Sequence, residues 1–129
     1  MKKIFYLTCI LATALSFCGC KKDEAKTLAE VTVMERNAPK PGVTVYMFGS
    51  RKGPGTTFFE PFFADKTVVT ESNGVATFEL QDVFDLDAVS TQTTLYFAVF
   101  SGSSTSATVL GQTAVTIKKG ETKTVTITL

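Results

Sequence analysis

Short runs rich in valine, threonine and aromatic residues make up most of the chain after residue 27, and turn-forming residues separate them. Such residues suit pleated, half-buried strands. Sustained helical periodicity is absent, and only residues 82–90 have room for one short helical turn. The runs that we expect to be strands are residues 28–35, 43–48, 66–71, 75–80, 94–101, 107–117 and 122–129. Their spacing predicts an all-β fold, an antiparallel β-sandwich of about seven strands.

Two turns between these runs have the sequence of β-hairpins. Asn73-Gly74 separates two β-rich runs, and both residues tolerate the positive φ of a tight turn. Residues 118–121 separate the last two runs, so we expect residues 122–129 to pair with the strand that ends at Ile117. The alternative is that this final strand is donated to a neighbouring subunit.

The N-terminal segment has the pattern of a secretory signal. Lys2-Lys3 is followed by an almost uninterrupted apolar run from Ile4 to Phe17. The run is shorter than the ~20 apolar residues of a membrane-spanning helix, so a cleavable signal over residues 1–19 is the better interpretation. The remaining length, about 110 residues, suits one domain.

The end of this signal, Phe17-Cys18-Gly19-Cys20, resembles the lipobox of bacterial lipoproteins, although Phe17 replaces the usual Leu and Cys18 the usual Ala or Ser. The resemblance implies that Cys20 becomes an acylated N-terminus, which anchors the protein to a membrane through lipid. The charged residues that follow are similar to those of Bacteroidetes-type lipoproteins. They imply that the protein is located at the outer membrane or cell surface, with the periplasmic face of the membrane as the alternative. Residues 20–27 would then be the acylated Cys and a polar tether.

The order of turns and strands over residues 28–129 is similar to that of a known family. It resembles the transthyretin-like sandwich of carboxypeptidase regulatory-like domains, an arrangement close to the immunoglobulin-like one. The matching pieces are residues 41–45, 70–78, 95–99 and 115–117 with 125–127. They contain turn and core positions, so the resemblance implies a fold and no functional residue. The connections at residues 51–66 and 101–113 are longer than in that family.

Composition excludes several kinds of chemistry. The chain has no His and no Trp, so the commonest general base and transition-metal ligand are missing. Its 13 basic and 12 acidic side chains are scattered, which argues against nucleic-acid binding. Cleavage after residue 19 would leave Cys20 as the last cysteine, too few for an internal disulfide or a thiolate metal site. We therefore expect no cofactor.

The most prominent candidate site is a cluster of four phenylalanines. Phe58, Phe59, Phe62 and Phe63 flank Glu60-Pro61. One hypothesis is an exposed aromatic patch that binds a protein, peptide or glycan. The alternative is that alternate rings face the core. Proline at this point argues against a central strand and favours an edge or a loop.

Acidic and hydroxyl clusters suggest other chemistry only weakly. Asp82, Asp85 and Asp87 offer oxygen ligands for calcium, but the residues between them are core-like, so capping aspartates at a turn are the better interpretation. Glu60 with Asp65 would have to converge in a cleft to act as acid and base. The serines of residues 101–106 lack a base, and we expect a flexible loop there.

These observations predict a membrane-anchored, non-enzymatic binding or structural module. The first alternative is a small accessory subunit of a fimbria-like or glycan-handling assembly, which rests on fold resemblance alone. The second is a carboxylate-based hydrolase. An exposed Phe patch would favour binding, an unpaired terminal strand would favour assembly, and a deep cleft with two carboxylates would favour an enzyme.

Overall fold

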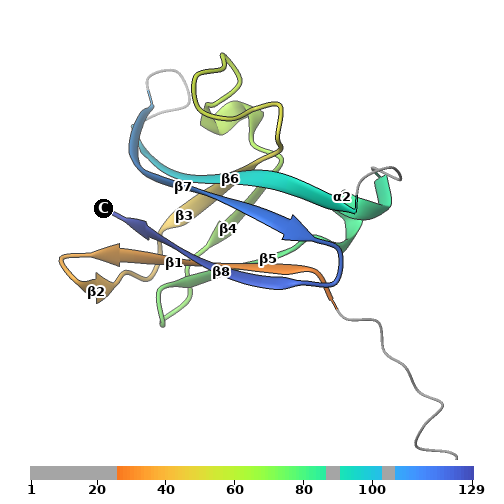
Figure 1. The fold of residues 1–129 in the computed structure, drawn as a ribbon. Helices are drawn as coiled ribbons and strands as arrows, with labels where there is room; N and C mark the ends of the chain where they lie inside the picture. Colours follow the sequence, from red (N-terminus) through yellow and green to blue (C-terminus); the bar gives the residue numbers. More distant parts are fainter. Residues whose placement is uncertain (1–25, 87–90, 103–106) are drawn as a thin grey trace, which may run out of the picture.

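The computed structural model describes residues 26–86, 91–102 and 107–129, and these form an all-β sandwich, as predicted (Figure 1). Eight strands are present in these ranges, one of them only two residues long. The elements in chain order are β1 (Leu28–Glu35), β2 (Ala38–Pro39), β3 (Thr44–Phe48), the 3₁₀ turn η1 (Pro61–Phe63), β4 (Lys66–Val69), β5 (Val75–Glu79), the short helix α2 (Gln81–Leu86), β6 (Gln92–Ser101), β7 (Thr108–Lys118) and β8 (Thr122–Thr128). No helix in the described ranges is long and apolar enough to cross a membrane.

The strands form two sheets that face each other. In the first sheet β1 is central, with β8 along one side and β5 and then β2 along the other. In the second sheet the order is β4-β3-β6-β7. All the pairs are antiparallel except β1 with β8, which is parallel, so the predicted antiparallel sandwich has one parallel edge.

The core lies between the sheets and follows the period-two pattern of the strands. Alternate residues of β1, such as Val31 and Val33, are fully buried, as are Phe78 and Phe97 on opposite sheets. The rings of this last pair lie 5.0 Å apart. Burying one such side chain stabilises the fold by roughly 1.5–3 kcal/mol relative to leaving it exposed. Among the described residues, no buried side-chain polar atom lacks a hydrogen-bond partner.

The turn predicted at Asn73-Gly74 is present, but the predicted hairpin is wrong. The Gly74 N–H donates to the Glu71 carbonyl at 2.9 Å, and Gly74 has a φ of +77°. However, β4 pairs with β3 in the second sheet, whereas β5 pairs with β1 in the first sheet. The turn therefore carries the chain from one sheet to the other. Turn chemistry fixes the local backbone but does not decide which sheet the next strand joins.

The turn at residues 118–121 is also correctly placed and also joins the two sheets. The Glu121 N–H donates to the Lys118 carbonyl at 3.1 Å. β8 then pairs with β1 from Leu28↔Thr122 to Met34↔Thr128 instead of with β7, so the predicted pairing of the last strand is wrong. The parallel ladder occupies the second edge of β1 and places Ile127 in the core. The last strand is thus paired within its own domain.

The two-residue hairpin of the first sheet lies at Arg36-Asn37. These residues have φ values of 53° and 63°, the pattern of a type I′ turn, and Glu35 lies opposite Ala38 across it. The strands expected from the sequence leave residues 36–42 as a connection, so this short hairpin and β2 were not predicted.

The first buried residue of the described ranges is Thr27, which the sequence analysis assigns to the tether. Its side chain is 1% exposed, and Oγ1 accepts a hydrogen bond from the Gly120 N–H at 2.7 Å. The Thr27 carbonyl accepts another from the Leu80 N–H at 2.9 Å. The chain therefore enters the sandwich at the end where α2 and the β7–β8 turn lie (Figure 1). The expected signal at residues 1–19 and Cys20 lie outside the described residues.

Candidate binding surface

A second aromatic cluster lies on the outer face of the β4-β3-β6-β7 sheet. Because Val45 and Met47 of β3 point into the core, the alternating side chains Tyr46 and Phe48 point outward. Phe100 of β6 lies beside them, with its ring 5.4 Å from that of Tyr46 and 6.0 Å from that of Phe48. Phe48 is nevertheless 0% exposed, so another part of the chain covers this face.

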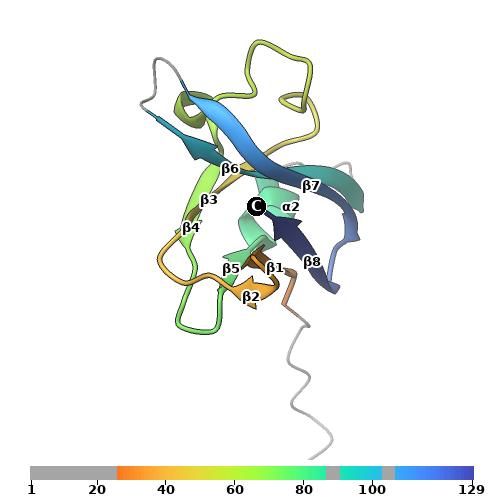
Figure 2. The ribbon, with the colours of Figure 1, turned by 90° about the vertical axis from the view of Figure 1, so that its left-hand side faces the viewer.

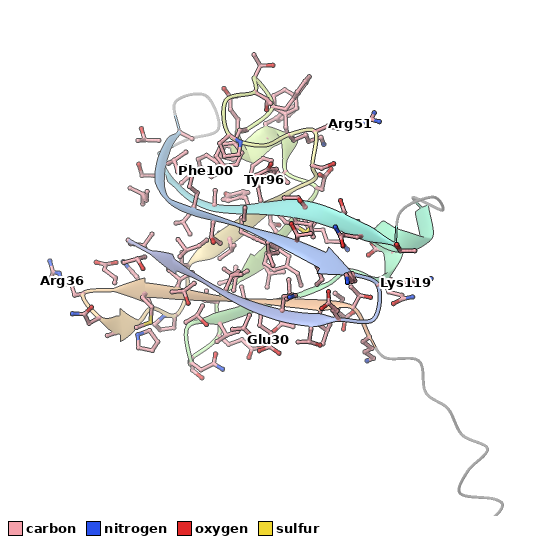
Figure 3. All side chains as sticks on the ribbon, viewed as in Figure 1. Glu30, Arg36, Arg51, Tyr96, Phe100 and Lys119 are labelled. Carbon is pink, nitrogen blue, oxygen red and sulfur yellow. The ribbon has the colours of Figure 1, made fainter. Side chains whose placement is uncertain are left out.

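The cover is the long connection between β3 and β4, residues 49–65, which we name the Phe loop. Phe59 packs its ring 4.8 Å from that of Phe48 and 5.8 Å from that of Phe100. Gly53 lies directly against Tyr96, because an added Cβ would come within 2.6 Å of that ring. Figure 2 shows the loop rising from the outer side of the β3–β6 pair, and Figure 3 shows Tyr96 and Phe100 beneath it.

Polar contacts fasten the two ends of the Phe loop to each other. The Lys52 ammonium donates to Asp65 Oδ1 at 2.8 Å and to the Phe63 carbonyl at 3.1 Å. The other carboxylate oxygen of Asp65 accepts from the Gly49 N–H at 2.8 Å. Sequence reasoning missed this clamp, because thirteen positions separate Lys52 from Asp65 and neither belongs to a recognisable motif.

The Phe loop exposes two of the four predicted phenylalanines. Phe62 is 76% exposed and Phe58 is 47% exposed, whereas Phe59 and Phe63 are half-buried. Pro61 begins the 3₁₀ turn that carries Phe62, consistent with the prediction of a loop or edge at this proline. Two of the four rings thus face solvent, and Phe59 packs on the outer face of the sheet instead of in the core between the sheets. Binding of a partner by the exposed rings stays a prediction.

The rings of Phe58, Phe62 and Phe63 do not form a flat platform. Phe63 meets Phe58 at 90° with centroids 5.2 Å apart, and it meets Phe62 at 89° with centroids 5.1 Å apart. Rings at right angles to one another do not share one plane, so they cannot together stack on a flat sugar ring.

The β6–β7 strand pair places one more exposed apolar side chain on the outer face of this sheet. A bulge between Val99 and Phe100 brings Phe100 opposite Val109, and directly opposite residues share one face of a sheet. Val109 is 39% exposed. We name Phe58, Phe62, Phe63 and Val109 together the Phe surface.

The acidic candidates do not form a metal site in the described part of the chain. Asp82, on α2, forms an ion pair with Lys66 at 2.8 Å, and the hydrogen bond from this lysine lowers the pKa of Asp82. The side chain of Asp85 and all of Asp87 lie outside the described residues. Within the described residues, no group of three or more Cys, Asp or Glu side chains is arranged to hold a metal ion.

The Glu60–Asp65 pair and the serine-rich segment give no catalytic arrangement among the described residues. Asp65 is occupied by Lys52 and by the Gly49 N–H, so its carboxylate has a structural role in the clamp. Residues 103–106 of the serine-rich segment lie outside the described ranges.

Neither a protein-family model nor a curated protein sequence matches the chain. Among solved structures, catechol 1,2-dioxygenase from Pseudomonas arvilla C-1 is similar over 84% of this chain and 54% of its own chain, with 9% sequence identity and a TM-score of 0.36. The chain thus spans about half the length of that structure. A likeness this distant says nothing about the activity of this chain, so its function has to be judged from the surfaces and charges described above.

Proposed function

We propose that the protein is a membrane-anchored, non-enzymatic module that binds another protein through the Phe surface. The observation that carries this proposal is the 76% exposure of Phe62 on a loop that is fastened by the Lys52–Asp65 clamp. An exposed apolar side chain costs solubility, and a loop held in place loses little conformational entropy when it binds. Fixed, exposed aromatic residues are typical anchors of protein interfaces.

The size of the Phe surface supports an anchor role. A phenylalanine side chain has roughly 200 Å² of surface, so the exposed parts of Phe58 and Phe62 together amount to roughly 250 Å². A stable interface buries about 800 Å² on each partner. The exposed area of the two rings is therefore enough for the centre of an interface but not for all of it. The partner must also contact the polar residues around them.

The membrane anchor is the second part of the proposal and comes from the sequence alone. Residues 17–20 resemble a lipobox, and Thr27 is the first buried residue of the described ranges. A tether of about seven residues between Cys20 and Thr27 would span at most about 25 Å. The Phe loop rises from the second sheet, whereas β1, the first strand of the described ranges, lies in the first sheet, so the Phe surface and the start of the sandwich belong to different sheets (Figure 1).

The accessory-subunit and enzyme alternatives receive no specific support. β8 is paired along β1, which leaves no unpaired terminal strand to donate among the described residues. Asp65 and Asp82 each form an ion pair with a lysine at 2.8 Å, so neither is a free carboxylate poised for acid–base chemistry.

The anchor is tested by replacing Cys20 with Ala and fractionating the cells. We expect the C20A protein to remain unprocessed and to lose its lipid modification. Metabolic labelling with an alkyne fatty acid measures this directly. Equal labelling of wild-type and C20A protein would exclude Cys20 as the acylated residue.

The Phe surface is tested by the size of the complex that the protein forms in gently solubilised membranes. We expect the double variant Phe58→Ala/Phe62→Ala to migrate as the free protein on a native gel, while wild type migrates in a larger complex. Val69→Ala is the matched control, because Val69 is 53% exposed but lies on β4, outside the Phe loop. A complex unchanged by the double variant would refute the proposed surface.

A further inference from the structure

Two adjoining hollows lie at one end of the sandwich, apart from the Phe surface. Their volumes are about 420 and 330 Å³, and they share Gly49, Val83 and Leu95 as lining residues. Together they form one groove between the start of the Phe loop, α2 and the first half of β6, which we name the end groove. Its size lies within the range of small-molecule sites.

One half of the end groove has an apolar floor. Met47 and Leu95 are each 1% exposed and close the bottom, and half-buried Val83 forms a side. A short hydrocarbon group placed here would remove apolar surface of both the ligand and the groove from water. Each buried methylene of a ligand contributes about 0.8 kcal/mol.

The charges around this floor are paired except at one position. Lys66 pairs with Asp82 and Lys52 pairs with Asp65, each at 2.8 Å. Arg51 lines the second hollow and is exposed, and no residue in the described ranges gives it a hydrogen bond or an ion pair. Figure 3 shows its side chain extending from the loop on the side where α2 lies.

Polar groups accompany Arg51 in the second hollow. Ser50 and Thr93 both line it and offer hydroxyl donors. An unpaired guanidinium with neighbouring hydroxyls matches a single carboxylate, which a guanidinium can bind through two parallel hydrogen bonds. Asp65 and Asp82 line the first hollow and are each paired with a lysine, so this half of the groove offers no unpaired cation to a second negative charge on the ligand.

We propose that the end groove binds a small monocarboxylate that has a short apolar body. The carboxylate lies against Arg51, Ser50 and Thr93, and the apolar body lies over Leu95, Val83 and Met47. This site uses none of the residues of the Phe surface, so it stands or falls separately from the proposed protein-binding function.

Hexanoate is a suitable probe, with hexanamide and acetate as matched comparisons. Hexanamide keeps the hydrocarbon and loses the charge, and acetate keeps the charge and loses the hydrocarbon. Saturation-transfer NMR at pH 7.4 on the full chain in nanodiscs of zwitterionic lipid measures binding, with empty nanodiscs as the blank. We expect hexanoate to bind at least fivefold more tightly than either comparison compound.

Two variants locate the bound molecule. Arg51→Gln should weaken hexanoate binding by about tenfold, because a charge-assisted pair is lost. Arg36→Gln is the control, since Arg36 is also exposed but lies at the β1–β2 turn (Figure 3). Val83→Phe should also abolish binding by filling the hollow, and its amide spectrum shows whether the fold is kept. Absence of hexanoate binding to wild type, or equal binding by wild type and Arg51→Gln, would overturn the proposal.

Discussion

Phe48 provides the sharpest test of how the Phe loop is held. Its ring lies on the outer face of a sheet, where a side chain is normally solvated, but it is 0% exposed because Phe59 and Phe100 pack against it. If the loop is a fixed part of the fold, Phe48→Ala should create a cavity like one in a protein core. Such substitutions cost about 3–5 kcal/mol in free energy of unfolding.

Phe62→Ala is the matched control within the same loop. Its side chain is 76% exposed, so removing it should change the free energy of unfolding by no more than about 0.5 kcal/mol. Urea denaturation of residues 21–129 measures both values, and a loss of 3 kcal/mol corresponds to a fall of roughly 12 °C or more in Tm. A loss below about 1 kcal/mol for Phe48→Ala would show that the loop detaches freely, which would remove the basis of a preformed Phe surface.

Three further perturbations test other parts of the account. Thr27→Val removes the acceptor of the Gly120 N–H in a buried site and should cost about 1–3 kcal/mol in free energy of unfolding, measured by urea denaturation; an unchanged midpoint would contradict this. Deleting residues 122–129 uncovers the core beside β1, so we expect aggregation and rapid proteolysis, whereas a monomer with an unchanged Tm would show that β8 is dispensable. The hydrogen bond from Lys40 lowers the pKa of Glu35 below its ordinary value of 4.5, so the pair stabilises the fold above that pH and its contribution is lost as pH falls through the lowered pKa. Lys40→Met should therefore lower the Tm at pH 7, and the Tm values of the variant and of wild type should converge in more acidic solution. A difference in Tm that persists in acid would refute the link between protonation of Glu35 and stability.

The strand positions follow closely from the sequence, because local pattern determines them. The predicted run at residues 28–35 coincides with β1, and the predicted runs at residues 75–80 and 122–129 each extend one residue beyond β5 and β8. Alternation of valine and threonine encodes which face of each strand is buried, and Asn-Gly and Lys-Gly turns mark where the strands end. These signals are carried by adjacent residues, so a single sequence reveals them.

The pairing of strands does not follow from the same signals. Gly74 and Gly120 supply the positive φ that their turns require, yet both turns lead to the opposite sheet. A sandwich needs such crossings as much as it needs hairpins. Whether a turn forms a hairpin or leads to the opposite sheet depends on which strand across the core has an unpaired edge. β1 has such an edge, and β8 pairs with it. This information is distributed over the whole chain.

The candidate binding surface is predictable only in part, because adjacent residues indicate the loop but not its contacts with other parts of the chain. A proline within four phenylalanines indicates a loop with aromatic residues, and the structure shows this arrangement. Which rings are buried depends on Phe48, the last residue of β3 before the loop, and on Phe100 of β6, which is far from the loop in sequence. The end groove combines residues from the Phe loop, α2 and β6, and no spacing in the sequence indicates it.

The most direct test of the central claim is site-specific photo-crosslinking in intact cells. A benzoyl-phenylalanine at position 62 replaces the exposed ring of the Phe surface, and the same residue at position 69 tests another exposed site, on β4, where Val69 is 53% exposed. If the Phe surface binds a protein, irradiation should give one discrete, protease-sensitive adduct from position 62 and none from position 69. No adduct at position 62, or the same adduct from both positions, would contradict the account.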